Sequence, residues 1–75
     1  MNECVIPISG RTNAERAKRI ALSHGIPASV VSVDPSVTEN GCSVGLRLMC
    51  AYAAEMLGLL DRSGIQHGGL IGWLK

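Results

Sequence analysis

The first apolar run of the chain is CVIPIS at residues 4–9, and it stops at Ser9-Gly10. A short run rich in β-branched residues and bounded by turn residues predicts a strand. Pro7 lies within this run and has no backbone N–H. The strand must therefore either bulge at Pro7 or leave that ladder position unpaired.

Apolar residues then recur with helical spacing over residues 12–25. Thr12 and Glu15 have the spacing of a capping box, in which each side chain bonds to the other residue's backbone N–H at the start of a helix. Gly25 favours the left-handed conformation that ends a helix, and Pro27 prevents its continuation. The pattern predicts an amphipathic helix directly after the first strand.

The second half of the chain repeats this order of elements. Segments 23–33 and 62–73 both show the end of a helix, a Gly-Ile pair, a connector and an apolar run, and an Asn-Gly hairpin signal lies at 40–41 between two apolar runs. Two βαβ halves in succession predict an α+β fold. The arrangement is ferredoxin-like βαββαβ, with a four-stranded antiparallel sheet and two helices on one face. The further predicted elements are strands at 28–33, 42–48 and 68–74 and a helix at 50–64.

Apolar residues cover most of the circumference of the second predicted helix, over residues 51–60. A helix that packs only on a sheet needs a single apolar stripe. The surplus favours a homodimer, or a partner docked through residues 51–60. Snorkelling Leu and Met side chains, or cover by the C-terminal strand, would also account for the extra apolar residues. An intermolecular contact and an arrangement within the chain therefore both stay open.

Composition narrows the class of protein. A chain of 75 residues has room for one domain, residues 1–75, and without Phe its core is aliphatic. The net charge of +1 and the scarcity of aromatic residues argue against nucleic-acid binding. The apolar stretch 44–60 is short and interrupted by charges, which argues against a membrane span. Three cysteines without a CxxC pair or a signal peptide indicate free thiols in the cytoplasm.

Cys42 directly follows the Asn-Gly pair and is the first candidate for chemistry. A thiol is a nucleophile only as thiolate, which backbone N–H groups of a glycine-rich turn and a nearby cation favour. Gly41 and Gly45 would let a partner approach closely. Arg47 is a candidate cation, although positions 42 and 47 point to opposite faces of a regular strand unless a bulge forms at Gly45. A small buried hydrophobe is the competing interpretation of Cys42.

No other site is complete in the sequence. The cysteines and histidines lack the pair spacing of a zinc site, so no metal is expected. Backbone N–H groups in the loop at Arg11 and Thr12 are a weak candidate for anion binding, without a Walker or dinucleotide motif. No carboxylate pair is available for acid–base catalysis, and we expect no cofactor. A carrier or binding protein is therefore favoured over a self-sufficient enzyme.

The segment GIPASVVSVDPSVTENGCSVGLRL, residues 25–48, resembles a family of small bacterial domains described as selenium/sulfur carrier-like proteins. These domains typically have a helix that ends in Gly-Ile-Pro, a strand, a proline-containing turn and a Gly-Cys step into an apolar strand with Arg. The family commonly has Gly after the cysteine, where this chain has Ser43. With the chain length and a second Gly-Ile at 64–65, the similarity covers nearly the whole chain. The matching positions are Gly25, Ile26, Pro27, Pro35, Gly41, Cys42 and Arg47.

The resemblance implies that Cys42 accepts sulfur or selenium as a persulfide or perselenide, with Gly41, Ser43 and Arg47 around it. Thiol exchange would then pass the atom to a partner enzyme. Donor and acceptor enzymes would supply the rest of the machinery, so the carrier needs no base, metal or cofactor of its own. The alternative, from another class, is a non-catalytic ferredoxin-like module for interaction or ligand sensing that dimerises through its second helix.

Overall fold

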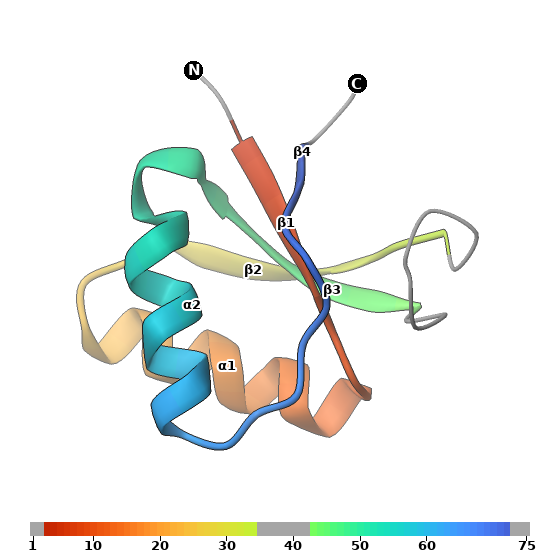
Figure 1. Ribbon diagram of the computed structural model, residues 1–75, viewed down its shortest axis with the longest axis horizontal. Coiled ribbons are helices and arrows are strands. Elements are labelled where there is room, and N and C mark those ends of the chain that lie inside the picture. The colour runs from red at the N-terminus through yellow and green to blue at the C-terminus, as the bar shows by residue number, and fades with distance from the viewer. Residues whose placement is uncertain (1–2, 35–42, 73–75) are drawn as a thin grey trace.

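The computed structural model describes residues 3–34 and 43–72, which form an α+β domain (Figure 1). Three longer strands form an antiparallel sheet with a two-residue strand at one edge, and two α-helices pack with it. The elements predicted before residue 64 are present, with ends that differ by up to three residues, the largest difference being the second α-helix, which begins at Ala53 instead of residue 50. Their bounds are β1 Glu3–Ile8, α1 Arg11–Ser23, β2 Ala28–Ser32, β3 Val44–Met49, the 3₁₀-helix η2 Cys50–Tyr52 and α2 Ala53–Arg62, followed by a two-residue strand β4 Ile71–Gly72.

The strands lie in the order β2-β3-β1-β4, and all neighbours are antiparallel. Each residue of β1 and of β2 faces one residue of β3, so neither pairing contains a bulge. β4 pairs only with Cys4 and Val5 of β1. Within the described residues, the strand predicted over 68–74 is thus limited to Ile71–Gly72.

Pro7 lies inside β1, opposite Gly45 of β3. In an extended strand the N–H and C=O groups of one residue point to the same edge. The Pro7 carbonyl accepts a hydrogen bond from the Gly68 N–H at 2.9 Å. The missing N–H of Pro7 therefore faces the irregular segment 66–70, and the β1–β3 ladder stays intact. The unpaired position predicted from the sequence is confirmed, and the bulge is unnecessary.

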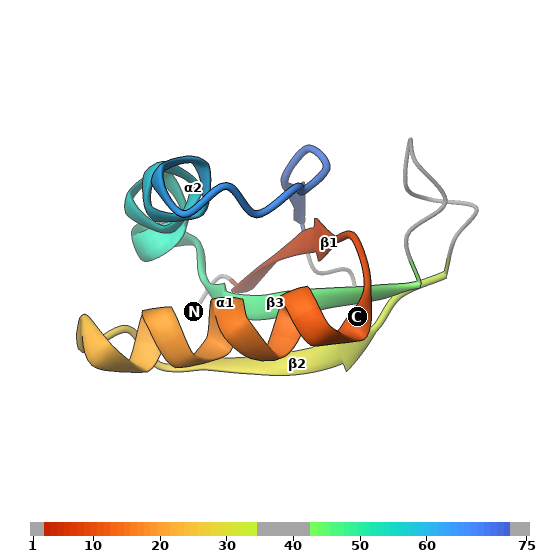
Figure 2. The same cartoon turned by 90° about the horizontal axis from the view of Figure 1, so that it is seen from below.

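The core lies on one face of the sheet. Side chains two residues apart share a face of a strand, and Ile6 and Ile8 of β1 point to the same side as Leu46 and Leu48 of β3. These four side chains belong to one buried cluster with residues of both helices, so α1 and α2 cover the same face. Figure 2 shows α1 running along β2 and β3. The helical members of the cluster are Ala14, Ala17, Ala21, Met56, Leu59 and Leu60.

Both helices end in the same way. Gly25 follows α1 and Gly64 follows α2, with φ angles of 75° and 72°. The N–H of the next residue, Ile26 or Ile65, bonds to the carbonyl five residues earlier at 2.8 and 3.0 Å. This is the Schellman motif. Ile26 and Ile65 are 1% and 3% exposed, so each Gly-Ile pair ends a helix and places an isoleucine in the core.

The capping box predicted at Thr12 and Glu15 does not form. The N-cap of α1 is Gly10, with φ 96°, and no described side chain caps it. A positive φ is open to glycine but costly for threonine, so the chain turns out of β1 at Gly10 and the helix starts earlier than the Thr12 pattern implies. The Asn13 amide Nδ2 instead donates to the Ser9 carbonyl at 2.8 Å.

Candidate functional site

Cys42 and Gly41, the centre of the predicted site, lie outside the described residues. The adjacent Ser43 is exposed. Its carbonyl accepts a hydrogen bond from the Val33 N–H at 3.0 Å, directly before β3 begins. The antiparallel pairing of β2 and β3 confirms the strand pairing predicted from the sequence, whereas the predicted Asn40-Gly41 turn lies outside the described residues. Ser43 is thus exposed at one end of the β2–β3 pair.

Arg47 lies in a regular part of β3 that contains no bulge. The register of β3 is continuous through Gly45 on both sides, so the bulge that would bring Arg47 to the face of residue 42 is not formed. Ser43, Gly45 and Arg47 share one face, and the Cα atoms of Ser43 and Arg47 are separated by about 13 Å of strand. Arg47 Nε lies 3.7 Å from Glu3 Oε1. The role of Arg47 beside Cys42 stays a prediction.

Gly45 is required by packing within the sheet. A Cβ atom there would lie 2.8 Å from Val5 Cγ1, 3.0 Å from the Ile6 carbonyl oxygen and 3.2 Å from Val33 Cγ2. Val5 and Ile6 are 1% and 0% exposed, so these neighbours have little room to move. The sequence interpretation of Gly45 as space for an approaching partner is therefore wrong, because the space is already occupied by Val5 and Ile6 of β1 and by Val33, the residue after β2.

Arg11 and Thr12 are exposed in the first turn of α1, as the weak anion-site prediction requires. The glycine N-cap leaves the first-turn N–H groups without a side-chain acceptor among the described residues. Nothing on this surface identifies a ligand, so the anion site stays a prediction.

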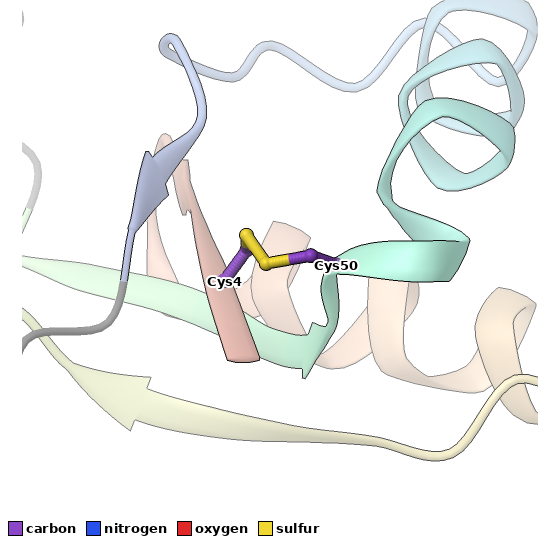
Figure 3. Close-up of a disulfide and its surroundings, with 2 residues drawn as sticks. All are labelled: Cys4 and Cys50. Atoms are coloured by element: carbon purple, nitrogen blue, oxygen red, sulfur yellow. A yellow bond between two sulfur atoms is a disulfide. The ribbon is translucent and has the colours of Figure 1, made fainter. Parts of the chain in front are cut away.

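Cys4 of β1 and Cys50 of η2 form a disulfide bond (Figure 3). Their Cα atoms lie 5.1 Å apart, although 46 positions separate the residues in sequence. The prediction of free thiols is wrong for this pair. Predicting this bond would have required the β1–β3 register, which sets Cys4 opposite Leu48, two residues before Cys50. Cysteine spacing carries no information about that register.

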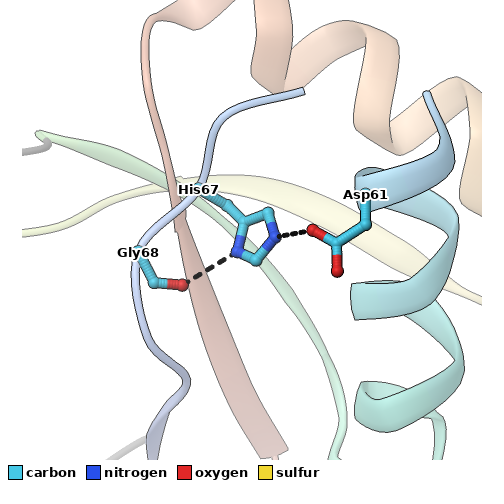
Figure 4. A network of polar contacts seen from close by, with 3 residues as sticks. All are labelled: Asp61, His67 and Gly68. Atoms are coloured by element: carbon cyan, nitrogen blue, oxygen red, sulfur yellow. Dashed lines mark hydrogen bonds and ion pairs between the residues drawn. The ribbon is translucent and has the colours of Figure 1, made fainter. Parts of the chain in front are cut away.

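His67 is held at both ring nitrogens (Figure 4). Its Nε2 is 2.8 Å from Asp61 Oδ1, and its Nδ1 is 3.0 Å from the Gly68 carbonyl oxygen. Both partners are acceptors, so the doubly protonated imidazolium satisfies them best. The hydrogen bond to the Gly68 carbonyl raises the pKa of His67, partial burial lowers it, and Asp61 raises it further, with a net upward shift.

This arrangement ties the segment 66–70 to the end of α2. His67 has neither ring nitrogen free for a substrate, which argues against a role as general base in this conformation. The pairing was not visible in the sequence because Asp61 and His67 stand on opposite sides of the Gly64 turn, and only the Schellman motif brings them together.

The apolar surplus of the second helix is largely used inside the molecule. Met56, Leu59 and Leu60 are buried and Leu57 is half-buried against the core, whereas Tyr52 is 36% exposed. A homodimer through residues 51–60 stays a prediction, now restricted to the smaller exposed set. That set consists of Ala51, Tyr52, Ala54 and Glu55.

Three further findings limit the functional classes. Within residues 3–34 and 43–72, no helix has the length and apolar character needed to cross a membrane. The same described residues contain no group of three or more His, Cys, Asp or Glu side chains placed to hold a metal ion. Comparison with protein-family models, curated proteins and solved structures found no match. Any function must therefore be argued from the residues themselves.

Proposed function

We propose that this chain carries sulfur or selenium on Cys42 and transfers it to a partner enzyme. The main support is the bond between the other two cysteines, because it leaves Cys42 as the one cysteine of three outside the Cys4–Cys50 pair. A second thiol near a persulfide attacks it and releases the sulfur. A carrier therefore benefits when its remaining cysteines are occupied. The resemblance of residues 25–48 to carrier-like domains points to the same residue.

The position of the disulfide also supports this function. Ser43 precedes β3 and Cys50 follows it, and an extended strand of that length separates their Cα atoms by about 23 Å. Ser43, the described residue next to Cys42 in the sequence, therefore lies far from the Cys4–Cys50 bond.

The transfer itself needs little from this chain. The Cys42 thiolate attacks the outer sulfur of a persulfide on the donor enzyme, and a new S–S bond forms on Cys42. The S–S bond in the donor breaks, and its electron pair leaves on the donor cysteine, which takes up the proton. An acceptor enzyme repeats the reaction in the opposite sense. No acid, base or metal of the carrier is consumed or required.

We also infer that the domain is ferredoxin-like, βαββαβ. The order β2-β3-β1-β4 and the packing of both helices on one face support this inference. The pairing of Ile71–Gly72 with β1 supplies the position of a fourth strand. This fold serves many functions, so it adds nothing to the choice of carrier.

The test is incubation with a cysteine desulfurase and cysteine, followed by intact-mass analysis without reductant. The wild type should gain the mass of one sulfur atom, and later reductant should remove it. Cys42→Ala should gain nothing, because its acceptor thiol is gone. Ser43→Ala is the matched control, since it changes the adjacent exposed residue but keeps the thiol, and it should load like the wild type.

Two results would refute the carrier function. One is a wild type that gains no sulfur while the donor enzyme is active. The other is an equal gain by Cys42→Ala, which would place the sulfur on the Cys4–Cys50 pair instead. An unloaded protein that forms a stable dimer would favour the interaction module that docks through residues 51–60.

A further inference from the structure

The Cys4–Cys50 bond joins two elements that the core holds very differently. Cys4 lies in β1, which has a neighbouring strand on each side, and is 5% exposed. Cys50 begins η2 and is half-buried. The η2 turn contains no buried residue, and no described side chain caps its start. The disulfide therefore attaches a peripheral turn to an interior strand (Figure 3).

The helix that follows has anchors of its own. Met56 and Leu60 are fully buried, and Leu59 is 8% exposed. These side chains belong to the same buried cluster as the strands. Loss of the disulfide would therefore remove the attachment of η2 while the apolar contacts still hold α2 on the sheet.

We propose that Cys4–Cys50 is a reversible thiol–disulfide exchange site, and that its reduction releases η2 while the rest of the domain stays folded. The co-substrate is a small thiol or a protein dithiol. The exchange itself uses neither Cys42 nor any residue beside it, so it can be tested separately from sulfur transport. Access to the attacked cysteine governs the rate of such exchange, and Cys50 is half-buried whereas Cys4 is only 5% exposed.

The exchange is balanced in two steps. A reductant thiolate attacks the sulfur of Cys50, the more exposed residue of the pair. The S–S bond breaks, and its electron pair leaves on the Cys4 sulfur, which takes up a proton. A second reductant thiolate then attacks the reductant sulfur of the mixed disulfide and releases Cys50, which is protonated in turn. Two thiols are oxidised to one disulfide, and one protein disulfide is reduced to two thiols.

The test uses the full chain with Cys42→Ser, so that only the pair can titrate. The protein is equilibrated without denaturant in glutathione buffers of stepped reduced-to-oxidised ratio and trapped with N-ethylmaleimide. Intact mass then counts the labelled thiols. Both thiols should become labelled together, in one two-electron transition, while the far-ultraviolet circular dichroism stays unchanged.

Hydrogen exchange locates the effect of reduction. The Ala53 N–H bonds to the Cys50 carbonyl at the end of η2, and its exchange rate should rise at least about tenfold on reduction. Amides of β1 and β3 should keep their rates. Cys4→Ser/Cys50→Ser should show the reduced pattern with and without reductant. If Cys4→Ser/Cys50→Ser does not fold, the exchange rates measured after reduction of the Cys4–Cys50 bond are enough to show whether η2 alone is released.

Three outcomes would overturn the proposal. The first is thiols that react only at denaturant concentrations that unfold the chain, which would make the bond purely structural. The second is failure of oxidised glutathione to join the two cysteines in the folded protein. The third is hydrogen exchange that rises equally in all strands on reduction, which would show global unfolding in place of a local release of η2.

Discussion

Replacing Gly45 by alanine adds one methyl group at the closest approach between β3 and its neighbours. The new Cβ atom would lie 2.8 Å from Val5 Cγ1 and 3.0 Å from the Ile6 carbonyl oxygen. Carbon atoms pack without repulsion at about 3.5–4.0 Å. The Ile6 oxygen belongs to the backbone of an interior strand, so rotation of a side chain cannot relieve that contact. Either β1 or β3 has to shift.

Two opposing effects set the size of the change. An added methylene in a packed core typically costs about 1–3 kcal/mol. Replacing glycine by alanine also restricts the unfolded chain, which stabilises the folded state by about 0.4–1 kcal/mol. The steric effect is larger, so the free energy of unfolding should fall by about 1–2 kcal/mol. A domain of this size has a total stability of about 4–11 kcal/mol, so the loss is measurable.

Urea unfolding followed by circular dichroism measures this loss. With a slope of about 1 kcal/mol per molar urea, the midpoint should fall by about 1–2 M. Gly69→Ala is the matched control, because nothing lies within 4 Å of its added Cβ and its φ is not positive. Its midpoint should stay the same or rise slightly. A Gly45→Ala midpoint at or above that of Gly69→Ala would show that the sheet has space at this position and refute the argument.

Three further predictions follow from local geometry. Gly25→Ala and Gly64→Ala should each lower the free energy of unfolding in urea by about 1 kcal/mol, because alanine is strained at φ angles of 75° and 72°. Thr12→Ala should change the free energy of unfolding by less than about 0.5 kcal/mol, the range for ordinary surface sites. A loss of about 1 kcal/mol would show that the Thr12 side chain caps the helix after all. The folded-state pKa of His67 is raised above 6.5, so its contribution to stability should be complete below pH 6.5 and lost as pH rises through the folded pKa. Urea midpoints between pH 5 and 9 check this, and Asp61→Asn should reduce the pH dependence without abolishing it, since the Gly68 carbonyl is the largest cause of the shift.

The order of strands and helices could be predicted because each element is specified by neighbours in sequence. Gly25 and Gly64 marked helix ends that are confirmed by their positive φ angles. The same local reasoning failed at Thr12, where two residues compete for the N-cap. Gly10 is the observed cap, and it succeeds because the chain has to reverse direction directly after β1. That requirement comes from the sheet and is absent from the capping-box pattern.

For the candidate site, the sequence could predict which residue types take part but not how they are arranged in space. Cys42 follows an Asn-Gly pair, and this suffices to nominate it, but the same reasoning assigned Gly45 to an approaching partner. The structure fills that space with Val5 of β1 and Val33 beyond β2. A glycine that admits a ligand and a glycine that admits a neighbouring strand look alike in the sequence, since both simply lack a side chain.

The amino-acid sequence by itself determined which segments before residue 64 become strands and helices, where each helix ends and which face of each is apolar. These features depend on contacts within about five residues, whose geometry the backbone limits to a few choices. Only the tertiary structure decided that Cys4 meets Cys50, that His67 meets Asp61 and that Gly45 is enclosed. Such pairs depend on strand register and on how the elements pack against one another, which the whole core selects at once.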